Sequence, residues 1–242
     1  MTVQSPAFEE RHQGMLAIQV GTAERMAFLR KVYSLFTMAM VVFAGTAWWA
    51  TDNDTAMGLI APILGGGMLG LVIFMAVAFG LLRVAASRFP LNIIALILFA
   101  MFEGLMSGAL ITWVLQGREN FGPGDGAEIV TQAAVLTGVV FGGLTLFTLT
   151  SKKDFSFLRA GLWVCFSVLI GLALIGWLFG FSLAGWGMSL GWVLLMAGFV
   201  IYDTSNIMRH YPVTAAVPAA IAIFLDVVIM FKHLLMLLSR RN

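Results

Sequence analysis

Long apolar runs alternate with short polar stretches along most of the chain. A helix needs about 20 mostly apolar residues to cross the hydrocarbon core of a bilayer. Seven runs reach that length, and the stretches between them, such as TDNDT and GPGDG, are rich in turn residues. The pattern therefore predicts an all-α integral membrane protein with seven transmembrane helices, at about 31–50, 56–82, 90–115, 128–150, 157–179, 185–207 and 214–238.

The segments outside these runs predict a simple domain organisation. Residues 1–29 are polar and lack the long apolar core of a cleavable signal peptide. We predict that they form a polar, cytoplasmic N-terminal tail, followed by one transmembrane domain over residues 30–242. The connections between the spans are all short, so the sequence leaves no room for a soluble domain.

Composition supports a membrane protein and narrows the possible functions. Charged residues make up 11% of the chain, whereas soluble domains carry about 25%. The three histidines, His12, His210 and His233, are scattered and have no zinc-binding spacing. No serine–histidine–acid arrangement is evident either. We therefore expect that the protein is not an enzyme and holds no resident cofactor.

The distribution of positive charge predicts the orientation in the membrane, because lysine and arginine concentrate in cytoplasmic loops. Opposite loops hold only Arg118 and the acidic Asp52, Asp54, Glu119 and Asp125. We expect a cytoplasmic N-terminus and a last helix that spans fully, although a re-entrant last segment is the alternative. Ten of the fourteen basic residues fall on alternate segments that begin with the N-terminus: Arg11, Arg25, Arg30, Lys31, Arg83, Arg88, Lys152, Lys153, Arg159 and Arg209.

One glycine-rich stretch, GGGMLG at 65–70, has the G-x-G-x-x-G spacing of dinucleotide-binding turns. Such a turn requires a preceding strand and an opening helix, and this one lies within a predicted membrane span. We interpret Gly66 and Gly70 as a pair of small residues, one helical turn apart, that lets two helices approach closely.

Three acidic residues, Glu103, Asp203 and Asp226, lie inside predicted spans. Such an acid can be a protonated structural group, but ionisable residues in membranes mark ion or proton pathways by default. Asp203 lies six residues before Arg209, about 9 Å inside the predicted cytoplasmic end. Asp226 lies eight residues after Pro218, a natural first-turn residue, and so about 12 Å deep. The two aspartates therefore lie at similar depths on consecutive antiparallel helices.

Contact between these two aspartates would create a proton switch, because two adjacent carboxylates cannot both ionise cheaply and share a proton. The deprotonated pair would offer oxygen ligands suited to calcium, which needs six to eight in all. Arg83 and Arg88 are candidate counter-ions for the pair, although each is also explained as a simple cytoplasmic anchor. Lys232, near the other end of the last helix, is expected to extend toward the outer headgroups.

Four stretches resemble the Bax inhibitor-1 family (transmembrane Bax inhibitor motif proteins). VIYDTSNIM, with Tyr202 and Thr204 flanking Asp203, is similar to the family's block at the end of helix six. AIAIFLDVVIMF is similar to its aspartate block in helix seven. FEGLMSG resembles the third helix, and LTSKKDFSFL resembles the loop between helices four and five. The resemblance covers roughly residues 25–240 and extends to the family's bacterial YccA-like members.

The resemblance implies a fold in which six helices surround a central seventh. It also implies a pH-sensitive calcium leak gated by an aspartate pair that maps onto Asp203 and Asp226, with Glu103 as a candidate pore acid. YccA-like members restrain FtsH, a protease of the bacterial inner membrane, so the alternative function is binding to and restraining such a protease. A third hypothesis is a structural bundle in which the aspartates only hold two helices together. None of these three hypotheses involves nucleic acid.

Overall fold

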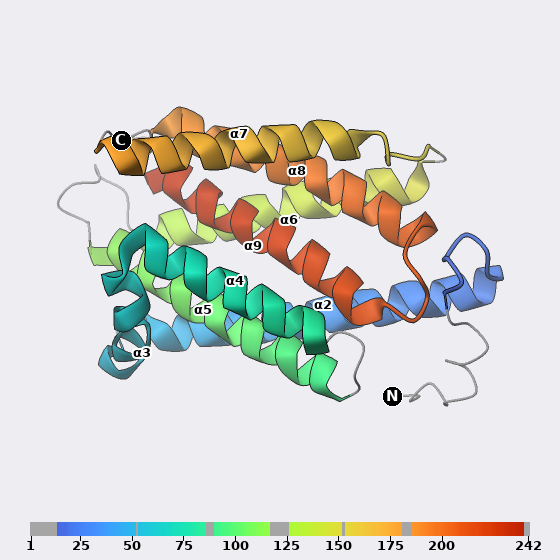
Figure 1. Cartoon of the computed structure of the whole chain (residues 1–242), viewed down its shortest axis with the longest axis horizontal. Coiled ribbons are helices and arrows are strands. Elements are labelled where there is room, and N and C mark those ends of the chain that lie inside the picture. The colour runs from blue at the N-terminus through green and yellow to red at the C-terminus, as the bar shows by residue number, and fades with distance from the viewer. Residues whose placement is uncertain are drawn as a thin grey trace.

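The computed structural model describes residues 14–51, 53–85, 90–116, 126–151, 153–180 and 185–239, and the regular elements in these ranges are all helices (Figure 1). The helices form an elongated bundle in which most of them run roughly along the long axis. Their bounds are α2 (Thr22–Ala50), α3 (Asp54–Gly65), α4 (Gly67–Ala85), α5 (Leu91–Gln116), α6 (Gly126–Thr150), α7 (Leu158–Phe179), α8 (Trp186–Arg209) and α9 (Ala216–Ser239).

Six of these helices are long and apolar enough to cross a membrane, namely α2, α5, α6, α7, α8 and α9. Each overlaps one of the predicted spans, so the all-α membrane class is confirmed. α2 begins at Thr22 rather than near 31, so part of the predicted tail is helical. Residues 1–13 of that tail lie outside the described residues.

The second predicted span, 56–82, is instead divided into α3 and α4. Pro62 lies inside α3 and removes a backbone donor, and Gly67 has a φ of +59°, a conformation that favours glycine. A Cβ on Gly66 would lie 2.9 Å from Cα of Gly70, in the same segment. A Cβ on Gly70 of α4 would lie 2.8 Å from the carbonyl oxygen of Ile63 in α3, so the two glycines let α3 and α4 approach closely at the break.

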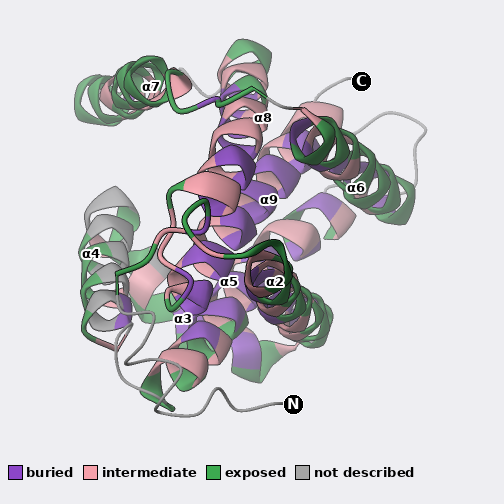
Figure 2. Cartoon of the chain, turned by 90° about the vertical axis from the view of Figure 1, so that its right-hand side faces the viewer, coloured by how far each residue is buried: buried purple, intermediate pink, exposed green. Residues whose placement is uncertain are grey.

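The last helix, α9, runs through the interior of the bundle and packs against α2, α5, α6 and α8 (Figure 2). Its side chains Ile223, Phe224, Val228 and Met230 are fully buried. α9 starts at the end of the bundle that holds the N-terminus of α2 and finishes at the opposite end (Figure 1). It therefore crosses the bundle without turning back, as the full-span prediction requires.

At the periphery, α7 makes its main contacts with α8 alone and leaves most of its apolar side chains exposed. Val164, Val168 and Leu178 keep more than half of their surface accessible. An apolar helix exposed in this way is stable only against hydrocarbon, because water would solvate it poorly. The exposed apolar side chains of α7 therefore fit its length and composition, which are those of a membrane-spanning helix.

α2 and α5 pack closely against each other. A Cβ on Gly104 would lie 2.7 Å from the carbonyl oxygen of Phe43, and one on Gly108 would lie 2.5 Å from Cβ of Ala50. Glycines one turn apart let two membrane helices pack backbone to backbone. This contact fixes the inner face of α5 against α2 and next to α9.

Residues 15–18, which precede α2, are tied to the loop between α8 and α9. The Ala17 N–H donates to the Tyr211 carbonyl at 2.9 Å, and the Val213 N–H donates to the Met15 carbonyl at 3.1 Å. Leu16 and Pro212 form an antiparallel bridge, and Ala17 is fully buried. We call residues 15–18 the N-terminal strap; it lies beside the α8–α9 loop in Figure 1.

Candidate functional site

Asp203 of α8 and Asp226 of α9 face each other where these consecutive helices pack together. Their carboxyl groups are within hydrogen-bonding reach when one of them carries a proton. Asp226 is 6% exposed, and its Oδ2 has no hydrogen-bond partner among the described residues. The predicted meeting of the two aspartates is therefore present in the fold, and its chemical role is taken up below.

The end of α8 is held in place by the connection between α6 and α7. The Phe155 N–H donates to Ser205 Oγ at 3.1 Å, and the Arg209 guanidinium donates to the Lys153 carbonyl at 3.3 Å. His210 Nε2 lies 2.8 Å from Asp154 Oδ2. The stretch that resembles a family loop thus fixes the helix end that carries Asp203.

The side-chain pKa values of Asp154 and Tyr211, two residues outside the spans, are shifted. Burial acts to raise the pKa of the Asp154 carboxyl, but hydrogen bonds from Ser156 and His210 outweigh it and hold that pKa below its usual range. Burial raises the pKa of the Tyr211 hydroxyl well above its usual value, and the nearby Asp203 and Tyr202 add to the effect. Tyr211 therefore stays a neutral hydroxyl beside the aspartate pair.

Glu103 of α5 pairs with Lys232 of α9. Lys232 Nζ lies 2.5 Å from Glu103 Oε2, and Glu103 is 2% exposed. The expectation that Lys232 extends to the outer headgroups is therefore wrong, because a buried carboxylate offers its ammonium a stronger partner than the headgroup region does. Glu103 lies in the bundle interior, as its assignment as a pore acid requires, but it is not free to act alone.

Several buried polar atoms near α9 have no hydrogen-bond partner in the part of the chain that the structure describes. They include Ser107 Oγ, one turn after Glu103, and His233 Nδ1, beside Lys232. The His233 ring stacks on Trp192 of α8, with ring centroids 5.2 Å apart. Buried polar groups are normally paired, so unpaired groups next to the Glu103–Lys232 pair point to a functional region.

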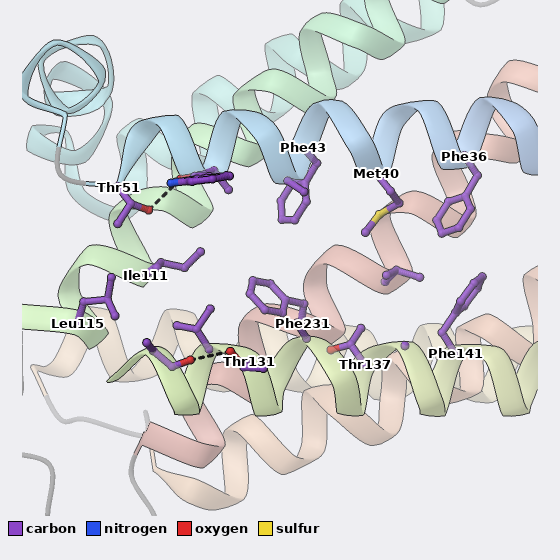
Figure 3. Close-up of a pocket in the computed structure, with 18 residues that line it drawn as sticks. Phe36, Met40, Phe43, Thr51, Ile111, Leu115, Thr131, Thr137, Phe141 and Phe231 are labelled. Carbon is purple, nitrogen blue, oxygen red and sulfur yellow. Dashed lines mark hydrogen bonds between the residues drawn. The ribbon is translucent and has the colours of Figure 1, made fainter. Parts of the chain in front are cut away.

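A cavity of about 890 Å³ lies between α2 and α6, with α5 and α9 completing its wall (Figure 3). Phe43, Phe141 and Phe231 point into it from three helices. The hydroxyls of Thr51 and Thr131 donate to carbonyls of their own helices. The wall therefore offers apolar surface and no charged group, which does not suit a metal cation.

The predicted arginine counter-ions and the predicted calcium ligands are only partly described by the structure. The side chain of Arg83 and the whole of Arg88 lie outside the described residues, so their pairing with the aspartates stays a prediction. Within the described ranges, no group of three or more histidine, cysteine, aspartate or glutamate side chains could hold a metal ion. Calcium at Asp203 and Asp226 would need oxygens from other groups as well.

The helices and the buried acids define a polytopic α-helical membrane protein with charged groups in its core. A family profile described as "Inhibitor of apoptosis-promoting Bax1" matches residues 25–242. The chain belongs to the Bax inhibitor-1 family.

Relatives from distant organisms match nearly the whole chain. It is 32% identical to "Protein lifeguard 4" of Mus musculus, over 90% of this chain and 87% of the mouse protein. It is 33% identical to an "Uncharacterized membrane protein" of Vibrio cholerae, over 91% of this chain and 92% of that protein. It is also 30% identical to "Bax inhibitor 1" of Schizosaccharomyces pombe, over 98% of this chain and 85% of the yeast protein.

Proposed function

We propose that the protein is a pH-sensitive calcium leak channel, with Asp203 and Asp226 as its gate and proton sensor. The single observation that carries this proposal is the contact between two carboxyl groups from consecutive helices in the interior of a membrane bundle. An acid pair in this position favours cations over anions. The family relationship is consistent with it.

The gate works through the shared proton. When one carboxyl is protonated, the two aspartates hydrogen bond and hold α8 against α9. When both are ionised, two charges about 4 Å apart repel by about 4 kcal/mol at an effective dielectric constant of about 20. That energy is several times RT, so the helices separate and the four oxygens become available to calcium. The leak therefore increases as pH rises.

The groups around the pair modulate this equilibrium without carrying it. Tyr211 of the α8–α9 loop and Tyr202 of α8 interact electrostatically with Asp203, and Arg159 interacts with Tyr202. Tyr211 is neutral over the physiological range because burial raises its pKa. In the proposed mechanism the proton on the aspartate pair is therefore the variable that opens or closes the gate.

Calcium flux into proteoliposomes tests the proposal. Purified protein is reconstituted at a matched density around an entrapped calcium indicator, and the initial rate is measured from pH 6 to pH 8. Asp203→Asn and Asp226→Asn should each abolish the pH dependence. Asp54→Asn, which makes the same chemical change at an exposed aspartate at the start of α3, is the matched control and should behave as wild type. Unchanged flux and pH dependence in both gate variants would refute the proposal.

The finer features of the architecture belong to the same proposal. We place α4 as a seventh span, α9 as the central helix among the seven, and the N-terminus in the cytoplasm of a bacterial inner membrane. The contacts of α9 with α2, α5, α6 and α8 support the central position. A YccA-like role, in which a membrane protease such as FtsH is restrained, stays the alternative. If the N-terminal tail binds the protease, deletion of residues 1–13 should abolish the co-purified complex.

A further inference from the structure

The ion pair between Glu103 and Lys232 lies deep in the bundle and is unequal in exposure. Glu103 is near the middle of α5 and keeps 2% of its side-chain surface exposed, while Lys232 keeps 21%. The ammonium therefore covers the carboxylate from its more accessible side. Any cation that approached Glu103 from that side would meet Lys232 first.

This pair is the next charged group along the interior from the aspartate pair, among the residues that the structure describes. On α9, Lys232 follows Asp226 by six residues, or about 9 Å along the axis. On α5, Phe99 lies one turn before Glu103 and packs against Phe224 of α9, with ring centroids 6.2 Å apart. The two acidic sites thus follow each other along the contact between α9 and its neighbours.

Stability alone is a weak reason for such a pair. Two charges lose their hydration when they are buried, and apolar residues of the same volume are often equally stabilising. Ser107, one turn after Glu103 on α5, is fully buried and its hydroxyl has no partner among the described residues. A carboxylate and a hydroxyl on adjacent turns are oxygen ligands of the kind that calcium accepts.

We propose that Glu103, assisted by Ser107, is a second cation site along the leak pathway, and that the Lys232 ammonium occupies it as a tethered blocking cation. A divalent cation that has passed the aspartate pair must displace Lys232 from Glu103 in order to continue. This inference rests on the proposed leak function. It adds a second control point that depends on charge competition and not on the proton of the aspartate pair.

Single and double substitutions test this blocking role in the same proteoliposomes. Lys232→Gln should raise the initial calcium flux on the order of tenfold, the factor that corresponds to about 1.4 kcal/mol of lost competition. Lys232→Arg should keep the wild-type flux because it retains the cation. Glu103→Gln and the double variant Glu103→Gln/Lys232→Gln should both fall below wild type. Lys153→Gln and Glu128→Gln, both exposed, are the matched controls.

A binding measurement separates this inference from the leak function itself. Calcium should raise the unfolding temperature of detergent-solubilised Lys232→Gln more than that of the double variant, because both keep the aspartate pair and only the first retains a free Glu103. If wild type passes no calcium, the leak function fails, and this comparison still tests the site.

Three results would overturn the inference: wild-type flux in assembled Lys232→Gln, wild-type flux in the double variant, or equal calcium effects on the two unfolding temperatures. If Lys232→Gln does not assemble, the calcium flux of the double variant tests the inference instead. That variant removes both charges and leaves two neutral amides, so no buried charge is left unpaired. A purely structural pair predicts that the single variants lose assembled protein and that the double variant regains it with unchanged flux.

Discussion

The contact between α2 and α5 makes a quantitative prediction about stability. A Cβ on Gly108 would lie 2.5 Å from Cβ of Ala50 and 2.9 Å from the carbonyl oxygen of Ala47. Carbon atoms in contact are normally about 3.5–4.0 Å apart, so Gly108→Ala requires the two helices to separate by about 1 Å. Neither neighbouring atom is the end of a flexible side chain, so the strain cannot be relieved by a change of rotamer.

The expected cost follows from two opposing effects. Overpacking of this kind destabilises a core by about 1–3 kcal/mol. Alanine gains about 0.8–1.0 kcal/mol over glycine in a helix interior, which offsets part of that loss. The net effect of Gly108→Ala is therefore a destabilisation of up to about 2 kcal/mol, and Gly104→Ala should behave similarly because its Cβ would lie 2.8 Å from Cβ of Thr46.

Reversible unfolding in detergent micelles measures this cost. Gly161→Ala on α7 is the matched control, because a Cβ there meets nothing within 4 Å, and it should stabilise the protein by about 0.5–1 kcal/mol. Both variants make the same chemical change in a helix, and only the packing differs. A Gly108→Ala protein as stable as Gly161→Ala would refute the close approach of α2 and α5.

Two further predictions concern the end of the bundle near the aspartate pair. Because the pKa of Asp154 is lowered in the folded protein, its interactions stabilise the fold above its usual pKa and are lost as pH falls through the lowered value. The ion pair between Asp154 and His210 is exposed, so Asp154→Asn should lower the free energy of unfolding by less than about 1 kcal/mol at pH 7 and leave it unchanged at pH 2. Unfolding experiments at both pH values measure this difference. An equal loss at both pH values would contradict the prediction. Ala17→Asp should detach the N-terminal strap and expose it to limited proteolysis, because Ala17 is fully buried, whereas Ile18→Asp, at a position 51% exposed, should not. Equal cleavage of the two variants would contradict the docking of the strap.

The sequence predicted most of the helical architecture because apolar runs of membrane length have few alternatives in a bilayer. The approach of Asp203 to Asp226 was predictable for a related reason. A short loop forces α8 and α9 to be antiparallel neighbours, so depth along each helix determines which residues can meet.

The predictions that the structure corrects also have physical explanations. Glu103 and Lys232 are 129 positions apart, and no local pattern relates them. A lysine near a helix end also resembles an interfacial anchor. The span predicted at 56–82 is divided in two, because Pro62 and the positive φ of Gly67 break the helix there. Gly104 and Gly108, within FEGLMSG, have the spacing of a packing motif and could have been recognised.

The pH dependence of calcium flux in Asp226→Asn proteoliposomes tests the central claim most directly. Under the proposed mechanism wild type should show flux that rises from pH 6 to pH 8, because loss of the shared proton opens the gate. Asp226→Asn removes the shared proton but keeps a hydrogen-bonding side chain of the same size, so its flux should be independent of pH. A variant that is assembled and still follows the wild-type pH profile would contradict the proposal that the aspartate pair is the gate.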